Sequence, residues 1–301
     1  MTGLLLRLAG PLQSWGEHST FAERDTLDFP TRSGLIGMFA AAMGRSRADA
    51  IGGHDGPGVD FTPLTFTVRI DRPGIRLVDF HTVGGGYPRH LTVPTAKGGR
   101  RPGDATTIVS RRHYLADAVF TVAVTGPNDL IESIAEALKR PKWGPYLGRR
   151  SCPPSEPFFL AGPIDDPERL LHEVLPLPRR KPDGDQKTVD VSFVYERLPR
   201  EGFLAAESGG EQSAGDHDQL GDGSARDEVD SESTYQGRQT PHRTYSRYEL
   251  NDVPLSFSPH RRYYRTRRVY VTTVPLPAEL CADTSKEYLK KLHECLKGVP
   301  R

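Results

Sequence analysis

Short apolar segments separated by polar turns predict the secondary structure of the first 165 residues. The segments 64–70 and 75–81 are two strands joined by the turn Asp71-Arg72-Pro73-Gly74. In full, strands are expected at 4–8, 64–70, 75–81, 114–124 and 157–162, and helices at 31–43 and 130–138. The order strand, helix, two strands, helix, strand is that of a ferredoxin-like (RRM-like) α+β fold.

Residues typical of helix ends flank both predicted helices. Thr31 is expected to cap the first helix, and Gly44 to end it after Met43. Asn128 is expected to cap the second helix, whose apolar positions follow the 3.6-residue period.

The second half of the chain predicts a smaller, mainly β region and a terminal helix. We expect the β region at 166–200 and 234–275, with a strand in TVDVSFVYE and another at the end of SPHRRYYRTRRVYVTTV. The helix, within 276–301, begins with the capping box Thr284-x-x-Glu287. Its apolar side predicts that it docks on its own domain or on a neighbour; that side carries Tyr288, Leu289, Leu292 and Leu296.

A glycine- and proline-rich insertion interrupts the first domain (1–165). It is placed at about 82–112 and predicts a long hairpin or loop that projects from the sheet. Loops longer than about 15 residues are uncommon without a function. The insertion suits a mobile arm that lies along a phosphodiester backbone. Its candidate contacts are Tyr87, His90, Arg89, Lys97, Arg100, Arg101, Arg111 and Arg112.

Acidic residues are concentrated between 201 and 233, a segment with few apolar side chains. It contains ten acidic residues and one basic residue, Arg226, and is therefore predicted to be disordered. Subtracting it from the totals of 40 basic and 39 acidic residues leaves 39 against 29. The rest of the chain is thus basic, which favours a polyanionic partner.

Several classes of protein are disfavoured by the sequence. The three cysteines form no CxxC pair, which fits a reducing cytoplasm, and no apolar run reaches the roughly 18 residues of a membrane span. Motifs of zinc proteases, P-loop enzymes and serine hydrolases are absent, as are clustered carboxylates for metal-dependent nuclease work. No cofactor, metal site or catalytic residue is therefore predicted.

The segment PYLGRRSC at 145–152 is the first candidate binding site. Gly148 permits a backbone conformation closed to other residues, and two prolines follow Cys152. Arg149 and Arg150 are expected to grip a phosphate, because the guanidinium fork matches phosphate geometry. The competing interpretation is a surface loop whose arginines pair with acids elsewhere. Tyr146 belongs to the same candidate site.

Two further segments are candidates for binding nucleic acid. In FPTRSG, the first amides of the helix after Thr31, with Arg32 and Ser33 beside them, are suited to an anion; a simple cap is the competing interpretation. In LQSWG, Gln13 is suited to hydrogen-bond a base edge and Trp15 to stack on a base, beside Ser14. A tryptophan so near a strand is equally typical of the core.

Catalytic signals are weaker. Metal-independent RNA cleavage needs a general base and a general acid, for which His81, His113 and Tyr87 are nominal candidates, but no pairing among them is visible. Cys152 precedes a proline and is expected to pack rather than to act as a nucleophile.

Five segments together resemble the CRISPR-associated CasD family of the type I-E Cascade complex, a branch of the RAMP superfamily. They occur in the family's order and cover most of residues 3–162. They are LLLRLAGPLQSWG, FPTRSGLIGMFAAAMG, DFHTV, RRHYLADAVFTVAV and RPKWGPYLGRRSCPPSEPFF. Beyond residue 162 the resemblance is loose, and the segment 201–233 and the tail after Thr273 depart from it.

The resemblance implies a non-catalytic subunit of an antiviral ribonucleoprotein complex. Family members hold the 5′ handle of the CRISPR RNA, cap one end of the backbone filament, and contact CasC and the large subunit CasA; target DNA is met through the complex. The resemblance also implies that the candidates in 13–15, 32–33 and 146–150 line one RNA cradle, and that His81, Tyr87 and the basic residues of a thumb hairpin bend the RNA.

Two other functions compete with this one. A related type I-C subfamily cleaves the precursor CRISPR RNA, so a metal-independent endoribonuclease is the alternative. A free-standing regulatory RNA-binding protein is the third.

Overall fold

The computed structural model describes residues 1–20, 22–52, 58–85, 90, 92–95, 98–100, 106–197, 245–258, 261–297 and 299. The chain is a mixed α+β protein in which antiparallel strands predominate. The segment 201–233, predicted to be disordered, lies outside the described residues.

A seven-stranded sheet forms the centre of the described protein. Its order is β10-β11-β9-β4-β7-β1-β8, and every neighbouring pair is antiparallel. The bounds are β1 Thr2–Ala9, β4 Thr65–Arg72, β7 Val119–Thr125, β8 Phe159–Asp165, β9 Thr188–Tyr195, β10 Ser246–Ser258 and β11 Arg261–Pro277. The C-terminal strands β9, β11 and β10 therefore extend the same sheet as β4.

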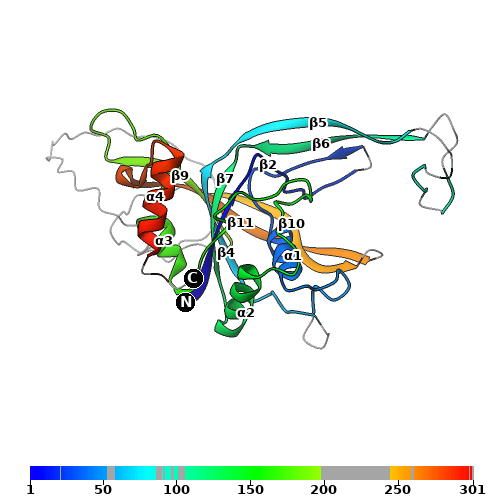
Figure 1. The fold of residues 1–301 in the computed structure, drawn as a ribbon, viewed down its shortest axis with the longest axis horizontal. Helices are drawn as coiled ribbons and strands as arrows, with labels where there is room; N and C mark the ends of the chain where they lie inside the picture. The colour runs from blue at the N-terminus through cyan, green and yellow to red at the C-terminus, as the bar shows by residue number, and fades with distance from the viewer. Residues whose placement is uncertain are drawn as a thin grey trace, which may run out of the picture. The chain divides into compact units, whose positions relative to one another are not determined.

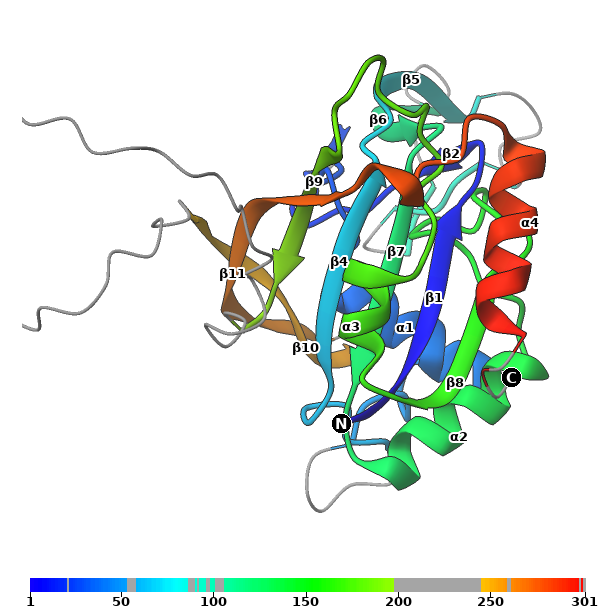
Figure 2. The same ribbon diagram turned by 90° about the vertical axis from the view of Figure 1, so that its left-hand side faces the viewer.

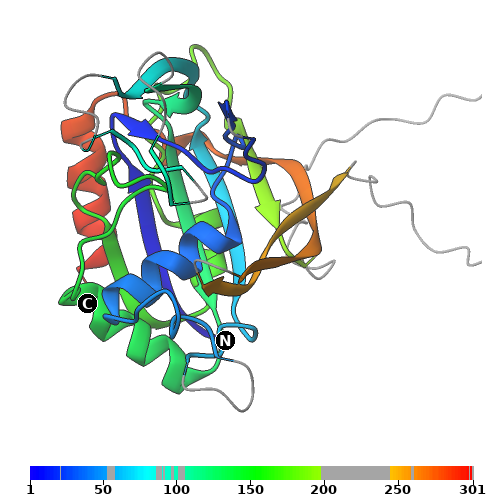
Figure 3. The same cartoon turned by 90° about the vertical axis from the view of Figure 1, so that its right-hand side faces the viewer.

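Helices cover both faces of this sheet. α1 (Arg32–Ala42) and α2 (Asn128–Lys139) lie on one face (Figure 3), while α3 (Pro167–Glu173) and α4 (Ser285–Leu296) lie on the other (Figure 2). All seven residues of β7 are buried, as expected for a strand covered on both sides. No helix among the described residues is long and apolar enough to cross a membrane.

The predicted helix ends are partly confirmed. The Thr31 hydroxyl accepts a hydrogen bond from the Gly34 amide at 3.2 Å, so Thr31 caps α1. Gly44 follows the helix with φ +71°, in the left-handed region that glycine adopts without strain. The prediction for α2 was wrong: Pro127 is the N-cap, and Asn128 is the first helical residue.

A second, smaller sheet is built around a long hairpin. β5 (Ile75–Gly84) pairs with β6 (Thr107–Ala116), and β2 (Leu12–Gln13) and β3 (Glu23–Arg24) also pair with β6. The hairpin extends away from the central sheet (Figure 1). Its arms begin and end outside the range 82–112 expected for the insertion.

The single strand predicted at 114–124 is two strands. β6 ends at Ala116 and β7 begins at Val119, because Asp117 has φ 55° and its amide donates to the Pro11 carbonyl at 3.1 Å. A left-handed residue breaks the extended backbone, so the chain leaves the hairpin and enters the central sheet at this point. Neither α3 nor β10 was predicted.

The terminal helix α4 docks on its own domain. Tyr288, Leu292 and Leu296 are buried, whereas Leu289 is exposed. The Arg7 guanidinium lies over the Tyr288 ring, 5.3 Å from its centroid. Thr284 caps the helix as predicted, but the Glu287 carboxylate accepts from the amide of Asp283 rather than from that of Thr284.

The buried phenol of α4 predicts a loss of stability at high pH. Burial, reinforced by the Asp71 carboxylate, raises the pKa of Tyr288 to about 12. The unfolded chain loses this proton near pH 10, so stability falls between pH 10 and 12, by about 1.4 kcal/mol at pH 11. We expect Tyr288→Phe to lose less stability than the wild type between pH 9 and pH 11 in urea denaturation. Equal losses would show that Tyr288 ionises as freely in the folded chain as in the unfolded one.

Candidate nucleic-acid interface

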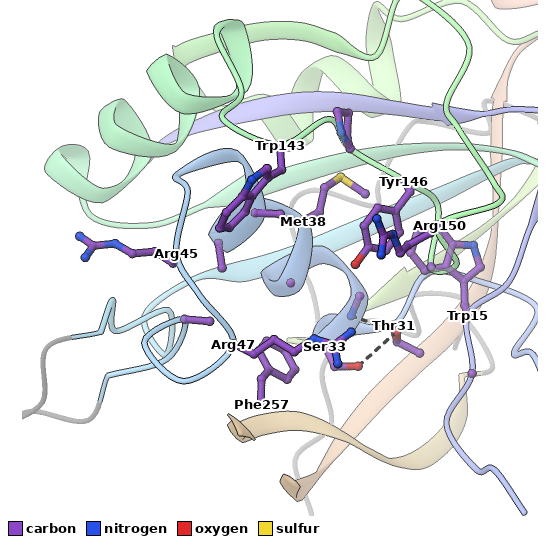
Figure 4. A pocket seen from close by; sticks show the side chains of 18 of the residues that line it. Trp15, Thr31, Ser33, Met38, Arg45, Arg47, Trp143, Tyr146, Arg150 and Phe257 are labelled. Atoms are coloured by element: carbon purple, nitrogen blue, oxygen red, sulfur yellow. Dashed lines mark hydrogen bonds between the residues drawn. The ribbon is translucent and has the colours of Figure 1, made fainter. Parts of the chain in front are cut away.

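A cleft of about 890 Å³ opens beside α1 (Figure 4). Five segments form it: residues 14–16 after β2, one side of α1, the loop 45–50 that follows α1, the loop 142–153 that follows α2, and the hairpin of β10 and β11. The helix α1 therefore provides the floor, and the loops and the hairpin around it provide the walls.

The cleft combines positive charge with aromatic rings. Within the described part of the chain, five cationic residues line it and no acidic residue does. The cations are Arg45, Arg47, Lys142, Arg150 and Arg262, and the exposed or half-buried aromatic residues are Trp143, Tyr146, Phe257 and Tyr264. Cations and aromatic rings without acids are the chemistry that single-stranded nucleic acid requires.

The loop that carries Arg150 is closed by its own backbone and is hydrogen-bonded to Ser14, directly after β2. The Leu147 amide donates to the Cys152 carbonyl at 2.7 Å, and the Ser14 amide donates to the Leu147 carbonyl at 3.1 Å. Gly148 has φ +83°, and a Cβ atom there would lie 1.7 Å from the Ser14 carbonyl oxygen. The predicted need for glycine is confirmed.

The two adjacent arginines of this loop diverge. Arg149 stacks over the Tyr114 ring at 4.6 Å from the centroid and donates to the Arg24 carbonyl at 3.0 Å, at the root of the hairpin. Arg150 is exposed and lines the cleft. The expected joint grip on one phosphate therefore does not form in this arrangement; the two guanidinium groups face different surroundings.

Cys152 lies inside the loop rather than at its surface. It is 1% exposed, and burial raises the pKa of its thiol. A thiolate nucleophile is correspondingly disfavoured. The expectation that Cys152 packs is confirmed.

Gln13, Ser14 and Trp15 support the site from within. All three are at most 3% exposed. The Gln13 amide donates to the Leu8 and Ala118 carbonyls, and its oxygen accepts from the Trp15 indole at 3.0 Å. The hydrogen-bonding capacity of Gln13 is used internally, so the expectation that it contacts a base edge was wrong. Trp15 belongs to the core rather than to a stacking platform.

The N-terminus of α1 is already occupied by an anion of the chain itself. The Asp252 carboxylate accepts from the Arg32 amide at 2.7 Å. The Arg32 side chain is 6% exposed and pairs with Glu196 at 2.8 Å. Arg32 is thus a structural residue and not an RNA contact in this arrangement, whereas Ser33 lines the cleft.

The hairpin separates its candidate histidines. His81 pairs across the strands with Ser110, and His113 pairs with Val78, in a register without shifts. Positions three residues apart point to opposite faces of a strand, so the two imidazoles cannot act on one phosphodiester together. His81 lies 3.2 Å from Asp79, and His113 lies 3.3 Å from Glu23.

The basic residues of the hairpin are only partly described. Arg111 is exposed near Glu23, and Arg112 donates to the Ser110 hydroxyl at 3.3 Å. Tyr87, Arg89 and Lys97 lie outside the described residues.

Sequence reasoning missed most of the cleft's cations and rings. Arg45 and Arg47 follow the stop signal Gly44, and Lys142 and Trp143 precede PYLGRRSC. The sequence did contain a signal for this site: two arginines closely follow the glycine that ends a helix rich in small residues. Arg262 lies in SPHRRYYRTRRVYVTTV, where arginines around tyrosines are typical of an RNA- or protein-binding surface, with a solvated strand face as the competing interpretation.

Three comparisons relate the chain to known proteins. The family model described as CRISPR-associated protein (Cas_Cas5) matches residues 3–270. "CRISPR system Cascade subunit CasD" of Escherichia coli (strain K12) is 35% identical over 182 residues, which cover 56% of this chain and 75% of that protein.

Two solved structures also resemble the chain. A chain of "CRISPR RNA-guided surveillance complex" has 44% identity and a TM-score of 0.73, with 98% of this chain and 99% of that chain covered. "Crystal structure of Cas protein" has 26% identity and a TM-score of 0.52, with 94% and 98% covered.

Proposed function

The chain belongs to the CRISPR-associated protein (Cas_Cas5) family, and we propose that it binds the 5′ handle of the CRISPR RNA as a subunit of a type I-E Cascade surveillance complex. The observation that carries the proposal is the cleft beside α1, whose described lining is cationic and aromatic without a carboxylate. Arg45, Arg47, Lys142, Arg150 and Arg262 bind the RNA phosphates.

We assign the N-terminal part of the chain to a ferredoxin-like RAMP domain. Its strands lie in the sheet order β8-β1-β7-β4, with α1 and α2 on one face, which supports the assignment. The hairpin of β5 and β6 is the thumb. The thumb contacts the RNA where it leaves the cleft, on the side where Arg149 lies at the root of the hairpin. The contacting residues are His81, Tyr87, Arg89, Lys97, Arg111 and Arg112.

The proposed place in the complex rests on the family. The subunit caps one end of the backbone filament in the cytoplasm, contacts CasC and CasA, and meets target DNA through the complex. The match to a chain of an RNA-guided surveillance complex over 98% of the length supports this placement.

We propose that the subunit does not cleave RNA. Metal-independent cleavage needs an acid and a base at one phosphodiester, whereas His81 and His113 lie on opposite faces of the hairpin. The buried Cys152 does not offer a nucleophile in their place.

Binding and cleavage are tested together with labelled precursor RNA from the chain's own CRISPR repeat, in EDTA. We expect retention without a product. The triple variant R47A/R150A/R262A is expected to bind about 50-fold more weakly at 0.15 M salt and to lower the slope of log K against log salt by about 2, because each single-strand phosphate contact contributes about 0.7.

A matched control removes three positive charges elsewhere. Lys139, Arg169 and Arg180 pair with nearby acids at the surface, so K139A/R169A/R180A changes the net charge equally. Equal losses of affinity in the two triple variants would refute the cleft as the RNA site. A cut that disappears in His81→Ala would identify the endoribonuclease instead.

A further inference from the structure

The floor of the cleft is apolar, whereas phosphates need cations or hydrogen-bond donors. After Ser33, the positions of α1 that line it are Gly34, Gly37, Met38, Ala40 and Ala41. None of these side chains can hydrogen-bond or pair with a phosphate. The cations lie on the loops and the hairpin around α1 rather than on the helix itself.

We propose that this face of α1 is a slot for an unstacked nucleobase, so that the cleft binds single-stranded RNA with a base turned inward and its phosphates on the cationic rim. The inference rests on the proposed RNA-binding function and specifies its ligand as an unpaired base, which duplex RNA does not offer. A duplex keeps each base stacked and paired, and it therefore presents only its backbone and groove edges.

Gly37 is the position that carries this inference. A Cβ atom built there meets only the Phe257 ring, at 3.9 Å, which is ordinary van der Waals contact. Glycine in the middle of a helix is less stable than alanine. Packing within the described protein therefore does not require glycine at this position, whereas an open slot does.

Gly34, one turn earlier, is the contrasting case. A Cβ atom there would lie 2.9 Å from the Trp15 ring and 3.0 Å from the Thr31 hydroxyl. Internal packing explains Gly34 completely. The two glycines of α1 are therefore explained differently: internal packing requires Gly34, whereas Gly37 is explained only by the space that it leaves open in the cleft.

Aromatic side chains stand on two sides of this floor. Trp143 and Tyr146 approach from the loop after α2, and Phe257 approaches from β10, with α1 between them (Figure 4). Trp143 is 49% exposed although it is a large aromatic residue. Stacking on such rings is tolerant of sequence, because every base has a π face. We therefore assign base stacking to these rings and not to Trp15, which is buried.

The test compares handle RNA with RNA in which each handle nucleotide in turn lacks its base. An abasic site keeps the phosphates and removes only the ring. We expect the full-length wild-type protein to lose about 10-fold to 100-fold in affinity at one or two adjacent positions, in proportion to a stacked base. 2-Aminopurine at those positions should be quenched on binding, since it would stack on the rings.

Two substitutions at Gly37 complete the test. Gly37→Leu fills the slot and is expected to bind intact and abasic RNA equally weakly, while the salt slope stays unchanged. Gly37→Ala, which the protein accommodates, narrows the slot by one methyl group; we expect an unchanged or higher melting temperature and a loss of affinity for intact RNA smaller than that of Gly37→Leu.

The outcomes separate the inference from the proposed function. The slot is refuted if the wild type binds abasic and intact RNA with equal affinity, or if every abasic position costs the same affinity. The proposed binding of RNA phosphates in the cleft is not affected by either result. A wild type that binds no handle RNA refutes the proposed function and the slot with it. Should Gly37→Leu fail to fold, the abasic series and the 2-aminopurine signal on the wild type decide.

Discussion

Gly148→Ala is expected to destabilise the protein by about 3 kcal/mol or more, because it combines a strained backbone with a direct clash. Its φ of +83° lies in the left-handed region, and the new Cβ atom would lie 1.7 Å from the Ser14 carbonyl oxygen. The Ser14 carbonyl belongs to the backbone and cannot move aside as the end of a flexible side chain can. The loop would separate from Ser14, and Arg150 would move with it.

Two other glycines separate the cost of the strained backbone from the cost of the clash. Gly184 also has a positive φ, +78°, but a Cβ atom there meets nothing within 4 Å; Gly144, whose φ is ordinary, also has open space around it. We expect Gly184→Ala to cost about 1–2 kcal/mol and Gly144→Ala less than about 0.5 kcal/mol.

Thermal unfolding and handle-RNA affinity measure the result. Gly148→Ala should unfold at least about 6 °C below the wild type and lose RNA affinity as Arg150→Ala does. A Gly148 variant no less stable than the Gly184 variant would show that the loop moves away from Ser14 at little cost.

Local signals predicted local structure well. Thr31 and Gly44 delimit α1 because caps and left-handed glycines act through neighbouring backbone groups. The 3.6-residue pattern of α2 was sufficient because one side of that helix faces the core. Neither prediction required knowledge of distant parts of the chain.

The break in the strand predicted at 114–124 is a different case. Asp117 has a left-handed backbone supported by a hydrogen bond to Pro11, more than a hundred residues earlier. Apolar periodicity alone continues through such a residue. The hairpin is a second such case, because it begins where Ile75 pairs with Ala116, before the start expected at about residue 82.

The site was the least predictable part, because burial decides whether a polar residue binds a ligand or the protein. Gln13 and Arg32 looked suited to RNA, yet their partners are carbonyls and carboxylates from distant segments. Conversely, Arg47 and Arg262 belong to one cleft only after α1 and the β10–β11 hairpin have met. The sequence shows which residues can bind RNA, but it does not show whether each side chain faces the cleft or the protein interior.

A buried four-charge cluster joins α1 to the C-terminal strands that form one wall of the cleft. Glu196 pairs with Arg32 at 2.8 Å and with Arg267 at 2.9 Å, and Arg267 pairs with Asp252 at 2.5 Å. All four side chains are at most 15% exposed. Two positive and two negative charges balance, so the cluster is neutral as a whole.

Glu196→Gln is expected to cost about 3–5 kcal/mol, because it leaves two buried guanidinium groups facing one carboxylate. The exposed pair of Arg169 and Glu173 is the matched control, for which Glu173→Gln should change stability by less than about 0.5 kcal/mol. Urea denaturation measures both.

The loss in Glu196→Gln should also appear in the cleft. Because Arg32 begins α1 and Arg267 belongs to β11, loosening their link moves the helix floor relative to Phe257 and Arg262. Handle-RNA affinity should therefore fall in Glu196→Gln at a urea concentration where the variant is still folded, and stay unchanged in Glu173→Gln. A folded Glu196 variant with wild-type affinity would show that the cleft keeps its shape without this cluster.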